Sequence, residues 1–256
     1  MAGLDDVREY WNRRPCNIRH SLKEVGSRDY FDEVEQRKYF VEPHIPGFAD
    51  FARWQGRKVL EIGCGIGTDA INFARAGADY SAVELSATSL DLARKRFETY
   101  GLQGRLIEGN AESLAPLFPG ERFDLIYSFG VIHHTPDPKA AIREILKIIH
   151  PNGELRLMLY ARNSWKAFMI EEGFDQPEAQ SGCPIAFTYS EEDVRKLLDG
   201  FDIVELRQAH IFPYVVESYV KYEYEVQPWF KAMPPAMFQA LERHLGWHML
   251  ITARPK

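Results

Sequence analysis

One short stretch, in which an apolar run leads directly into three alternate glycines, constrains this chain more than any other. From Val59 to Thr68 the sequence reads VLEIGCGIGT. Glycines at such a junction let the backbone turn tightly and let a ligand approach without side chains in the way. The pattern predicts a buried strand over 58–62, a ligand-binding turn, and a helix that begins at Thr68 and ends near residue 76.

The segment from Arg57 to Tyr160 alternates short apolar runs with longer amphipathic ones, which is typical of βα units around a parallel sheet. Further strands are expected over 80–84, 105–108, 123–128, 155–160, 201–206 and 247–253. Further helices are expected over 86–100, 138–150 and 191–198. Ser86 is the expected N-cap of the first of these helices, and the turn Pro151-Asn152-Gly153 is expected to end the second. The fold class is therefore α/β, with a doubly wound sheet.

The spacing of the glycines argues against a dinucleotide ligand. Gly63, Gly65 and Gly67 stand at every second position, whereas the dinucleotide fingerprint places its third glycine three residues after the second, where Thr68 stands. Glu84 ends the second predicted strand, where a carboxylate can accept both hydroxyls of a ribose. A carboxylate beside a turn with little room for phosphates indicates a nucleoside ligand.

These features belong to a longer series of motifs. Gly109-Asn110-Ala111-Glu112 follows the third predicted strand, and FDLIYS, from Phe123 to Ser128, leads to Val131-Ile132-His133-His134. With the glycine turn and Glu84, this series resembles the ordered motifs of class I (Rossmann-like) S-adenosylmethionine-dependent methyltransferases, over 59–160. The resemblance implies a mostly parallel, seven-stranded sheet whose last strand is antiparallel. It also implies that S-adenosylmethionine lies across the carboxyl ends of the strands and is converted to S-adenosylhomocysteine.

The resemblance also assigns cofactor contacts residue by residue. It puts the methionine part of the cofactor against Gly63, Cys64 and Gly65, with Glu84 on the ribose. Asn110, Ala111 and Glu112 would border the adenine, although the family frequently has Asp where Asn110 stands. Ser128, Phe129 and His133 would lie under the sulfonium. The remaining expected contacts flank these positions and are Glu61, Gly67, Thr68 and Leu85.

Transfer to an oxygen or nitrogen requires that a proton leave the acceptor. His133 and His134 follow the fourth predicted strand and are the nearest candidate bases, because imidazole titrates in the right range. The alternative is that His133 packs on the cofactor and His134 caps the next segment. Tyr160 and Arg162, at the tip of the fifth predicted strand, are candidates to orient the acceptor.

The two ends of the chain fall outside the motif series. Residues 1–56 are expected to form a helical lid, in which Tyr10, Trp11 and Arg14 border the substrate and exclude water. The methyltransferase domain is expected over 57–256, with aromatic-rich insertions at about 163–190 and 208–245. His210 and Tyr214, in the second insertion, are further candidates for substrate binding.

Composition excludes several other classes of function. The 37 acidic and 31 basic residues give a net charge of -6, which disfavours a nucleic-acid partner or an anionic membrane. Cys16, Cys64 and Cys183 form none of the close pairs that metal sites use, so no metal is expected. Sparse cysteines, no apparent secretory signal and no long apolar segment favour the cytoplasm. The oligomeric state stays open, with a homodimer as one option.

The sequence therefore predicts methyl transfer from S-adenosylmethionine to an oxygen or nitrogen of a small-molecule acceptor. Two alternatives remain. One is an NAD-type oxidoreductase on a similar sheet, which the glycine spacing disfavours. The other is a protein that keeps the cofactor site but has lost catalysis.

Overall fold

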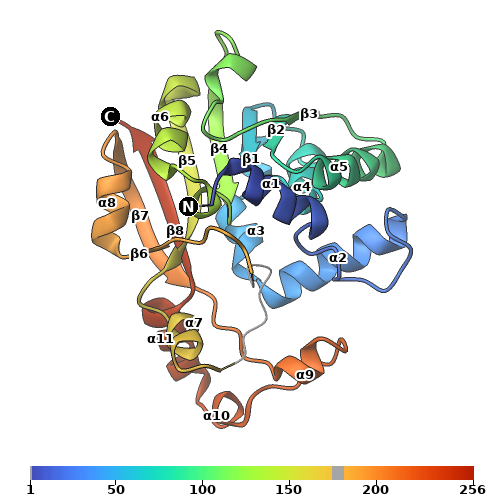
Figure 1. The fold of residues 1–256 in the computed structure, drawn as a ribbon, viewed down its shortest axis with the longest axis vertical. Helices are drawn as coiled ribbons and strands as arrows, with labels where there is room; N and C mark the ends of the chain where they lie inside the picture. The colour runs from blue at the N-terminus through green and yellow to red at the C-terminus, as the bar shows by residue number, and fades with distance from the viewer. Residues whose placement is uncertain (1, 175–181) are drawn as a thin grey trace.

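The structure, a computed structural model, describes residues 2–174 and 182–256. An eight-stranded sheet forms its centre, with helices on both faces (Figure 1). Seven strands follow the order β3-β2-β1-β4-β5-β8-β7, and the short β6 pairs with the end of β5. The strands are β1 (Lys58–Ile62), β2 (Asp79–Glu84), β3 (Arg105–Glu108), β4 (Phe123–Phe129), β5 (Ile149–Ala161), β6 (Thr188–Tyr189), β7 (Phe201–Ala209) and β8 (His248–Pro255).

Strand directions match those that the family resemblance implies. Strands β1 to β5 pair in parallel, whereas β8 is antiparallel to both β5 and β7. The carboxyl ends of parallel strands share one edge of a sheet, and ligands of such folds bind at that edge. The segments that follow β1, β2, β3 and β4 therefore meet on the same side of the molecule.

Helices cover the sheet and extend beyond it. The α-helices are α1 (Leu4–Arg13), α2 (Arg28–Val41), α3 (His44–Ala49), α4 (Thr68–Arg75), α5 (Ala87–Tyr100), α6 (Pro138–Ile148), α7 (Trp165–Glu171), α8 (Glu191–Leu197), α9 (Val216–Tyr219), α10 (Pro228–Lys231) and α11 (Pro235–Leu245). Three 3₁₀ turns are η1 (Phe51–Trp54), η2 (Ala115–Leu117) and η3 (Ile132–His134). None of the described helices is long and apolar enough to cross a membrane.

Each face of the sheet has its own apolar core. One core joins the strands to α6 and α8 and includes Leu60, Ile145 and Val194, all fully buried. The other joins them to α4 and α5 and includes Val59 and Phe73. The neighbouring residues Val59 and Leu60 lie in different cores because successive side chains of a strand point to opposite faces. This double burial explains why the central strands are apolar almost throughout.

Most element boundaries lie close to their predicted positions, and the end of α6 is the main correction. Ser86 caps α5 as predicted, since its hydroxyl accepts a hydrogen bond from Ser89 N at 3.1 Å. Helix α6, however, ends at Ile148, and Pro151-Asn152-Gly153 lies inside β5 rather than in a turn. Proline disfavours the helical conformation of the residue before it, so the chain extends before Pro151.

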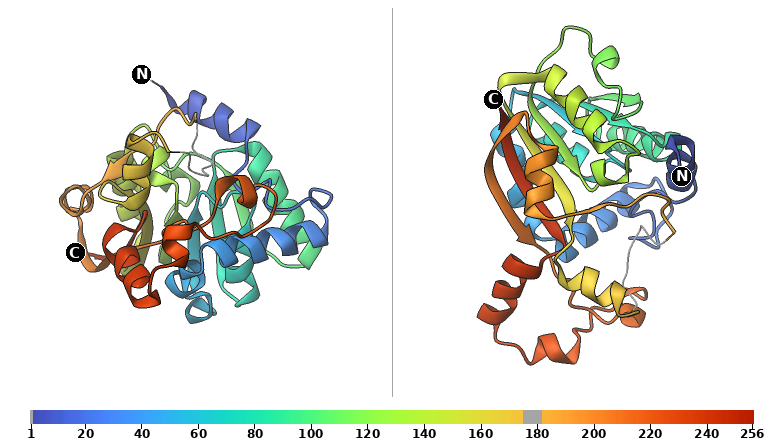
Figure 2. Two further views of the ribbon diagram at one scale, coloured as in Figure 1. Left: turned by 90° about the horizontal axis from the view of Figure 1, so that it is seen from below. Right: turned by 60° about the vertical axis from the view of Figure 1, so that its left-hand side comes forward.

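The segments outside the central sheet lie over its carboxyl edge or beyond it. Helix α1 contacts α5, and α2 contacts α4 and α5. Helices α7, α10 and α11 gather beyond one end of the sheet (Figure 2). The predicted insertion over 163–190 contains α7 and β6, but its residues 175–181 lie outside the described part.

Candidate functional site

A cavity of about 540 Å³ opens at the carboxyl edge of the sheet. This volume falls within the usual range of small-molecule sites, roughly 300–1,000 Å³. At one end of the cavity, which we call the glycine end, the wall contains Gly63, Gly65, Glu84, Asn110 and Ala111. At the other end, over β5 and β8, the wall contains Glu42, Met158, Tyr160, His210 and His248, and we call this the histidine end.

The glycine turn brings backbone rather than side chains to the cavity. Gly63 and Gly65 have φ angles of 76° and 54°, a region that side chains rarely adopt. A Cβ on Gly63 would lie 2.3 Å from Val131, whereas a Cβ on Gly65 would meet no atom within 4 Å. Gly67 lies behind the wall, where a Cβ would be 3.2 Å from Ala93. Gly65 therefore keeps space open for a ligand, and Gly63 and Gly67 keep the fold closely packed.

Glu84 is fixed beside that space. Its two carboxylate oxygens accept hydrogen bonds from Gly65 N and Ser86 N, each at 2.8 Å. Burial raises the pKa of the carboxyl group, and the backbone donors partly oppose the rise. A carboxylate offers about four acceptor positions, so two remain for hydroxyl donors. Glu84 and the empty space over Gly65 thus fit a ribose.

Only part of the predicted adenine-binding set reaches the cavity. Asn110 and Ala111 line it, as does Leu85. The Asn110 side-chain oxygen accepts a hydrogen bond from Glu112 N at 3.0 Å, which fixes the loop. The Glu112 carboxylate accepts from Asp137 N at 2.8 Å and lies outside the wall. Glu112 is therefore positioned to hold the loop before α6 rather than to touch a ligand.

The two candidate bases differ in access to the cavity. His133 is fully buried behind the wall, with its ring 3.8 Å from that of Tyr160 between centroids. Burial lowers its pKa well below the usual range, and neither ring nitrogen has a partner among the described residues. The structure places it as a packed, neutral ring.

His134 lines the cavity. Its Nδ1 lies 2.6 Å from the carbonyl oxygen of Ile185. A carbonyl only accepts, so Nδ1 carries the proton and Nε2 presents a lone pair. Burial lowers the pKa of His134 to about 4, and Nε2 has no partner in the described part of the chain. His134 can therefore accept a proton, but only as a weak base.

The other predicted residues near β4 and β5 divide in the same way. Glu61, Cys64, Thr68, Phe129 and Tyr160 all line the cavity. Ser128 is buried behind the wall, and its hydroxyl donates to the carbonyl oxygen of Ile62 at 3.3 Å. Arg162 also lies outside the wall. It pairs with Asp193 at 2.9 Å and donates to the carbonyl oxygen of Thr188 at 3.1 Å, so it ties β6 to α8.

The two outlying segments each contribute some of the residues predicted for them. Trp11 and Arg14 line the cavity, whereas Tyr10 packs edge-on against Trp11 outside the wall. His210 lines it, but Tyr214 pairs with Val226 in an isolated β-bridge and stacks on Phe40. Each residue that lies outside the wall is close in sequence to one that lines it, Tyr10 to Trp11 and Tyr214 to His210.

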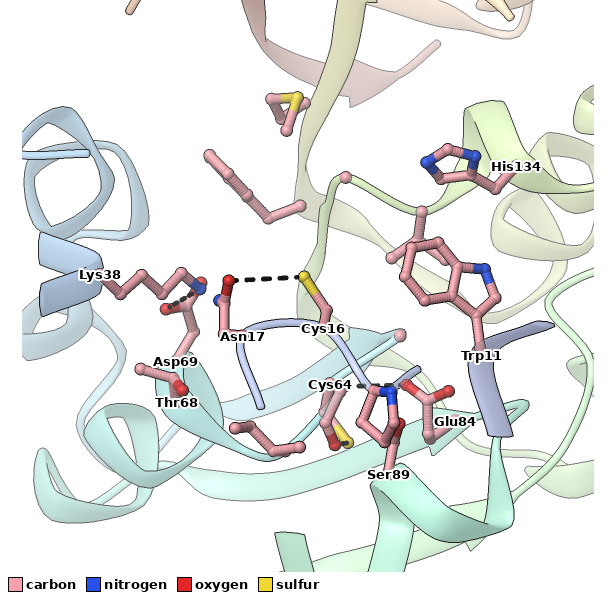
Figure 3. A pocket seen from close by; sticks show the side chains of 18 of the residues that line it. Trp11, Cys16, Asn17, Lys38, Cys64, Thr68, Asp69, Glu84, Ser89 and His134 are labelled. Atoms are coloured by element: carbon pink, nitrogen blue, oxygen red, sulfur yellow. Dashed lines mark hydrogen bonds and ion pairs between the residues drawn. The ribbon is translucent and has the colours of Figure 1, made fainter. Parts of the chain in front are cut away.

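Several polar wall residues were not predicted. Cys16 and Asn17 occupy the middle of the pocket, with Trp11 and His134 on one side and Lys38 and Asp69 on the other (Figure 3). Lys38 pairs with the buried Asp69 at 2.8 Å. Burial is the largest influence and lowers the pKa of Lys38, but the carboxylates of Asp69, Glu42 and Glu61 together outweigh it and raise that pKa. The one sequence feature that could have drawn attention to this pair is the position of Asp69 in the first turn of α4, where an acidic side chain interacts favourably with the helix dipole.

A buried arginine joins α2 to α9. Arg37 is 6 % exposed, and its Nη2 donates to the carbonyl oxygen of Tyr219 at 2.7 Å. Its guanidinium carbon lies 4.3 Å from the Tyr219 ring and 3.9 Å from the Tyr222 ring, measured to centroids. The Tyr222 hydroxyl donates to the carbonyl oxygen of Arg19 at 2.6 Å. The N-terminal segment and the second insertion are thus fastened together over the cavity.

Comparison with known proteins agrees with this geometry. Residues 60–157 match the model of a methyltransferase domain family. The structure superposes on that of a Synechocystis magnesium protoporphyrin IX methyltransferase solved with bound S-adenosylmethionine, at a TM-score of 0.60 and 17% identity. The superposition covers 100% of this chain and 98% of that one. The chain therefore contains a segment similar to a methyltransferase domain, and it shares its fold with methyltransferases of known structure. A putative methyltransferase from Bacillus halodurans superposes on 84% of the chain and 100% of its own length, at a TM-score of 0.58 and 23% identity.

Relatives identified by sequence cover part of this chain. The ubiquinone biosynthesis O-methyltransferase of Proteus mirabilis is 30% identical over 118 residues, which is 46% of this chain and 48% of that protein. The protein of the same name from Erwinia tasmaniensis is 30% identical over 164 residues, 61% of this chain and 64% of that protein. The chain therefore spans less than two thirds of each of these relatives.

Proposed function

We propose that this chain transfers a methyl group from S-adenosylmethionine to an oxygen or nitrogen of a small-molecule acceptor. The observation that carries the proposal is the position of Glu84, held at 2.8 Å by Gly65 N in the wall of the cavity. Bound there, S-adenosylmethionine would supply an activated methyl group with its own leaving group. Gly63, Gly65, Glu84, Asn110 and Ala111 are the residues proposed to hold it.

The chain's own contribution is then alignment and exclusion of water. Displacement at a methyl carbon requires the acceptor atom, the carbon and the sulfur to lie in line, so fixed positions are worth more than strong bases. Cys16 and Asn17 lie in the middle of the cavity with Trp11 to one side, and these side chains would keep water from the reacting atoms (Figure 3). His134 Nε2 is the proposed proton acceptor on the wall.

An oxygen acceptor is the first choice. The sequence relatives named above are O-methyltransferases of ubiquinone biosynthesis, which supports an oxygen nucleophile without identifying the molecule. The net charge of -6 supports a small acceptor rather than nucleic acid, because strand binding requires a basic surface. We propose that the acceptor binds at the histidine end, because aromatic and polar side chains line the wall there.

The test combines ligand binding with product detection. Calorimetry with S-adenosylhomocysteine and with NADH should show binding of the first alone. Mass spectrometry should then detect S-adenosylhomocysteine when the protein is incubated with S-adenosylmethionine and a panel of hydroxylated or amino small molecules. Binding of NADH without binding of S-adenosylhomocysteine would reverse the proposal. Cofactor binding with no turnover across a broad panel would favour the catalytically silent alternative.

A further inference from the structure

The histidine end contains a group of side chains that methyl transfer alone does not require. Glu42, His210 and His248 each offer one ligand atom, and these atoms all lie within 4.8 Å of one another. They come from three separate places, the C-cap of α2, the residue after β7 and the first residue of β8. All three side chains line the cavity, so the group is open to a ligand.

His248 is held in the orientation that a metal ligand requires. Its Nδ1 lies 2.9 Å from Nε2 of His44, and its Nε2 lies 3.6 Å from the Glu42 carboxylate. When Nδ1 donates to His44, Nε2 presents its lone pair toward Glu42. Metal-binding histidines almost always donate their second ring N–H to a fixed acceptor in this way. His44 is thus placed as the supporting partner, one shell behind the ligands.

His210 is held in an unusual backbone conformation. Its φ angle is 73°, in the left-handed region that few residues other than glycine adopt. Its carbonyl oxygen accepts a hydrogen bond from Trp247 N at 2.8 Å, which fixes the backbone. Its ring stacks on that of His248 at 4.7 Å between centroids. Such conformations persist where the surrounding structure enforces them, and they concentrate at functional sites.

We propose that Glu42, His210 and His248 bind one divalent transition-metal ion, and that an oxygen or nitrogen of the acceptor completes its coordination from the cavity. Two imidazoles and one carboxylate are a donor set that suits zinc or iron(II) and leaves open positions. Ligand distances of about 2.0–2.2 Å require the three donor atoms to move together by on the order of 1 Å. The nearby Lys38 is already paired with Asp69 at 2.8 Å.

The role of the acceptor in coordinating the metal rests on the proposed methyl transfer, whereas metal binding by the three side chains does not. The ring of Phe129, at the end of β4, packs edge-on against that of His248 at 5.3 Å between centroids. The cluster therefore shares a wall with the predicted sulfonium site. An acceptor that donates an oxygen lone pair to the cation would be anchored there, which selects for hydroxylated or carboxylated small molecules.

Metal binding is tested on the full chain, stripped with a chelator and titrated with zinc chloride by calorimetry. We expect one ion per chain, and visible absorption bands when cobalt(II) is added instead. H248A and H210A should each weaken binding by about 100-fold or more, and H44Q by about 10- to 100-fold through lost positioning. H150A is the matched control. His150 lies in β5 outside the cavity wall and should bind as the wild type does.

Thermal melting and binding of S-adenosylhomocysteine verify that each variant is folded. Absence of one-to-one binding by the wild type would overturn the site, as would undiminished binding by both H248A and H210A. Methyl transfer to an active acceptor should fall at least about tenfold on chelation and return with metal. Transfer unaffected by chelation would overturn the acceptor role alone. Metal binding without any methyl transfer would leave the site standing and count against the proposed function.

Discussion

The glycine end of the cavity is formed by three short stretches, 61–66, 83–85 and 109–111, each of which directly follows or ends a parallel strand. The histidine end is instead formed by residues at the end of α2, the end of β7, the start of β8 and the carboxyl end of β5. Backbone groups and one carboxylate define the first, whereas long side chains from remote positions define the second. A local strand-turn-helix motif therefore forms the proposed cofactor site, whereas the tertiary assembly forms the proposed acceptor and metal site.

The largest effect is expected when the one side chain on which the glycine end depends, that of Glu84, is removed. Glu84→Ala should weaken S-adenosylhomocysteine binding by about 100- to 10,000-fold, because two hydrogen bonds to a charged acceptor contribute about 1.5–3 kcal/mol each. Calorimetry measures the change. Glu112→Ala is the matched control, since Glu112 lies outside the wall and should change affinity only a few-fold. A loss below tenfold in Glu84→Ala would contradict the assignment.

A second pair of variants separates packing from ligand space at the turn. Gly63→Ala should lower the free energy of unfolding by about 2–4 kcal/mol, because it adds a collision with Val131 to the strain of a positive φ angle. Gly65→Ala should cost only about 1–2 kcal/mol, since its Cβ meets no atom. Urea unfolding gives both values. Equal losses would show that the collision with Val131 is relieved.

His134 connects the cavity to the first insertion through the carbonyl oxygen of Ile185, and its titration reports on the burial of its ring there, because burial lowers its pKa and the hydrogen bond to Ile185 only partly opposes that shift. Its pKa is lowered from 6.5 to about 4 in the folded chain, so the unfolded chain binds more protons between these values. Stability from the neutral ring is fully present above pH 6.5 and is lost as the pH falls toward 4. Wild type should lose about 1–3 kcal/mol more than His134→Gln over this range. Equal pH dependence of urea unfolding in the two proteins would contradict the burial of a neutral His134 ring.

The smallest effect is expected at Arg162, which the sequence suggested as an acceptor contact. Its side chain pairs with Asp193 on the surface and lies outside the cavity wall. Surface ion pairs contribute little, so Arg162→Ala should change kcat/KM by less than about twofold. Steady-state kinetics with any active acceptor will measure it. A tenfold loss would mean that the histidine end extends further along β5 than the wall residues indicate.

The same contrast explains which residues could be predicted from the sequence. Gly65 and Glu84 occupy fixed places at the ends of adjacent parallel strands, so the order of strands along the chain was enough to bring them together. Glu42, His210 and His248 lie far apart in the sequence and in no motif. The antiparallel pairing of β7 with β8 brings His210 next to His248, and the packing of α2 brings Glu42 to both. Their proximity could not be inferred from spacing.

Sequence position also failed to separate neighbouring side chains. His133 and His134 both follow β4, yet one is sealed behind Tyr160 and the other lines the cavity. They lie in the 3₁₀ turn η3, where consecutive side chains point in different directions. Motif order predicts such a turn but does not set the rotation of each residue within it.

The contacts of Arg37, which join α2 to α9, constrain how ligands can enter and leave the cavity. Arg37 contacts Tyr219 and Tyr222, and the Tyr222 hydroxyl donates to the carbonyl oxygen of Arg19. These contacts link the N-terminal segment to the second insertion, so that moving one segment alone would break them. Under the proposed function, any exchange of cofactor or product that moves one of these segments would have to move the other or break these contacts. Where turnover requires such a joint movement, its frequency would set an upper limit on the proposed turnover rate, whatever the speed of the chemical step.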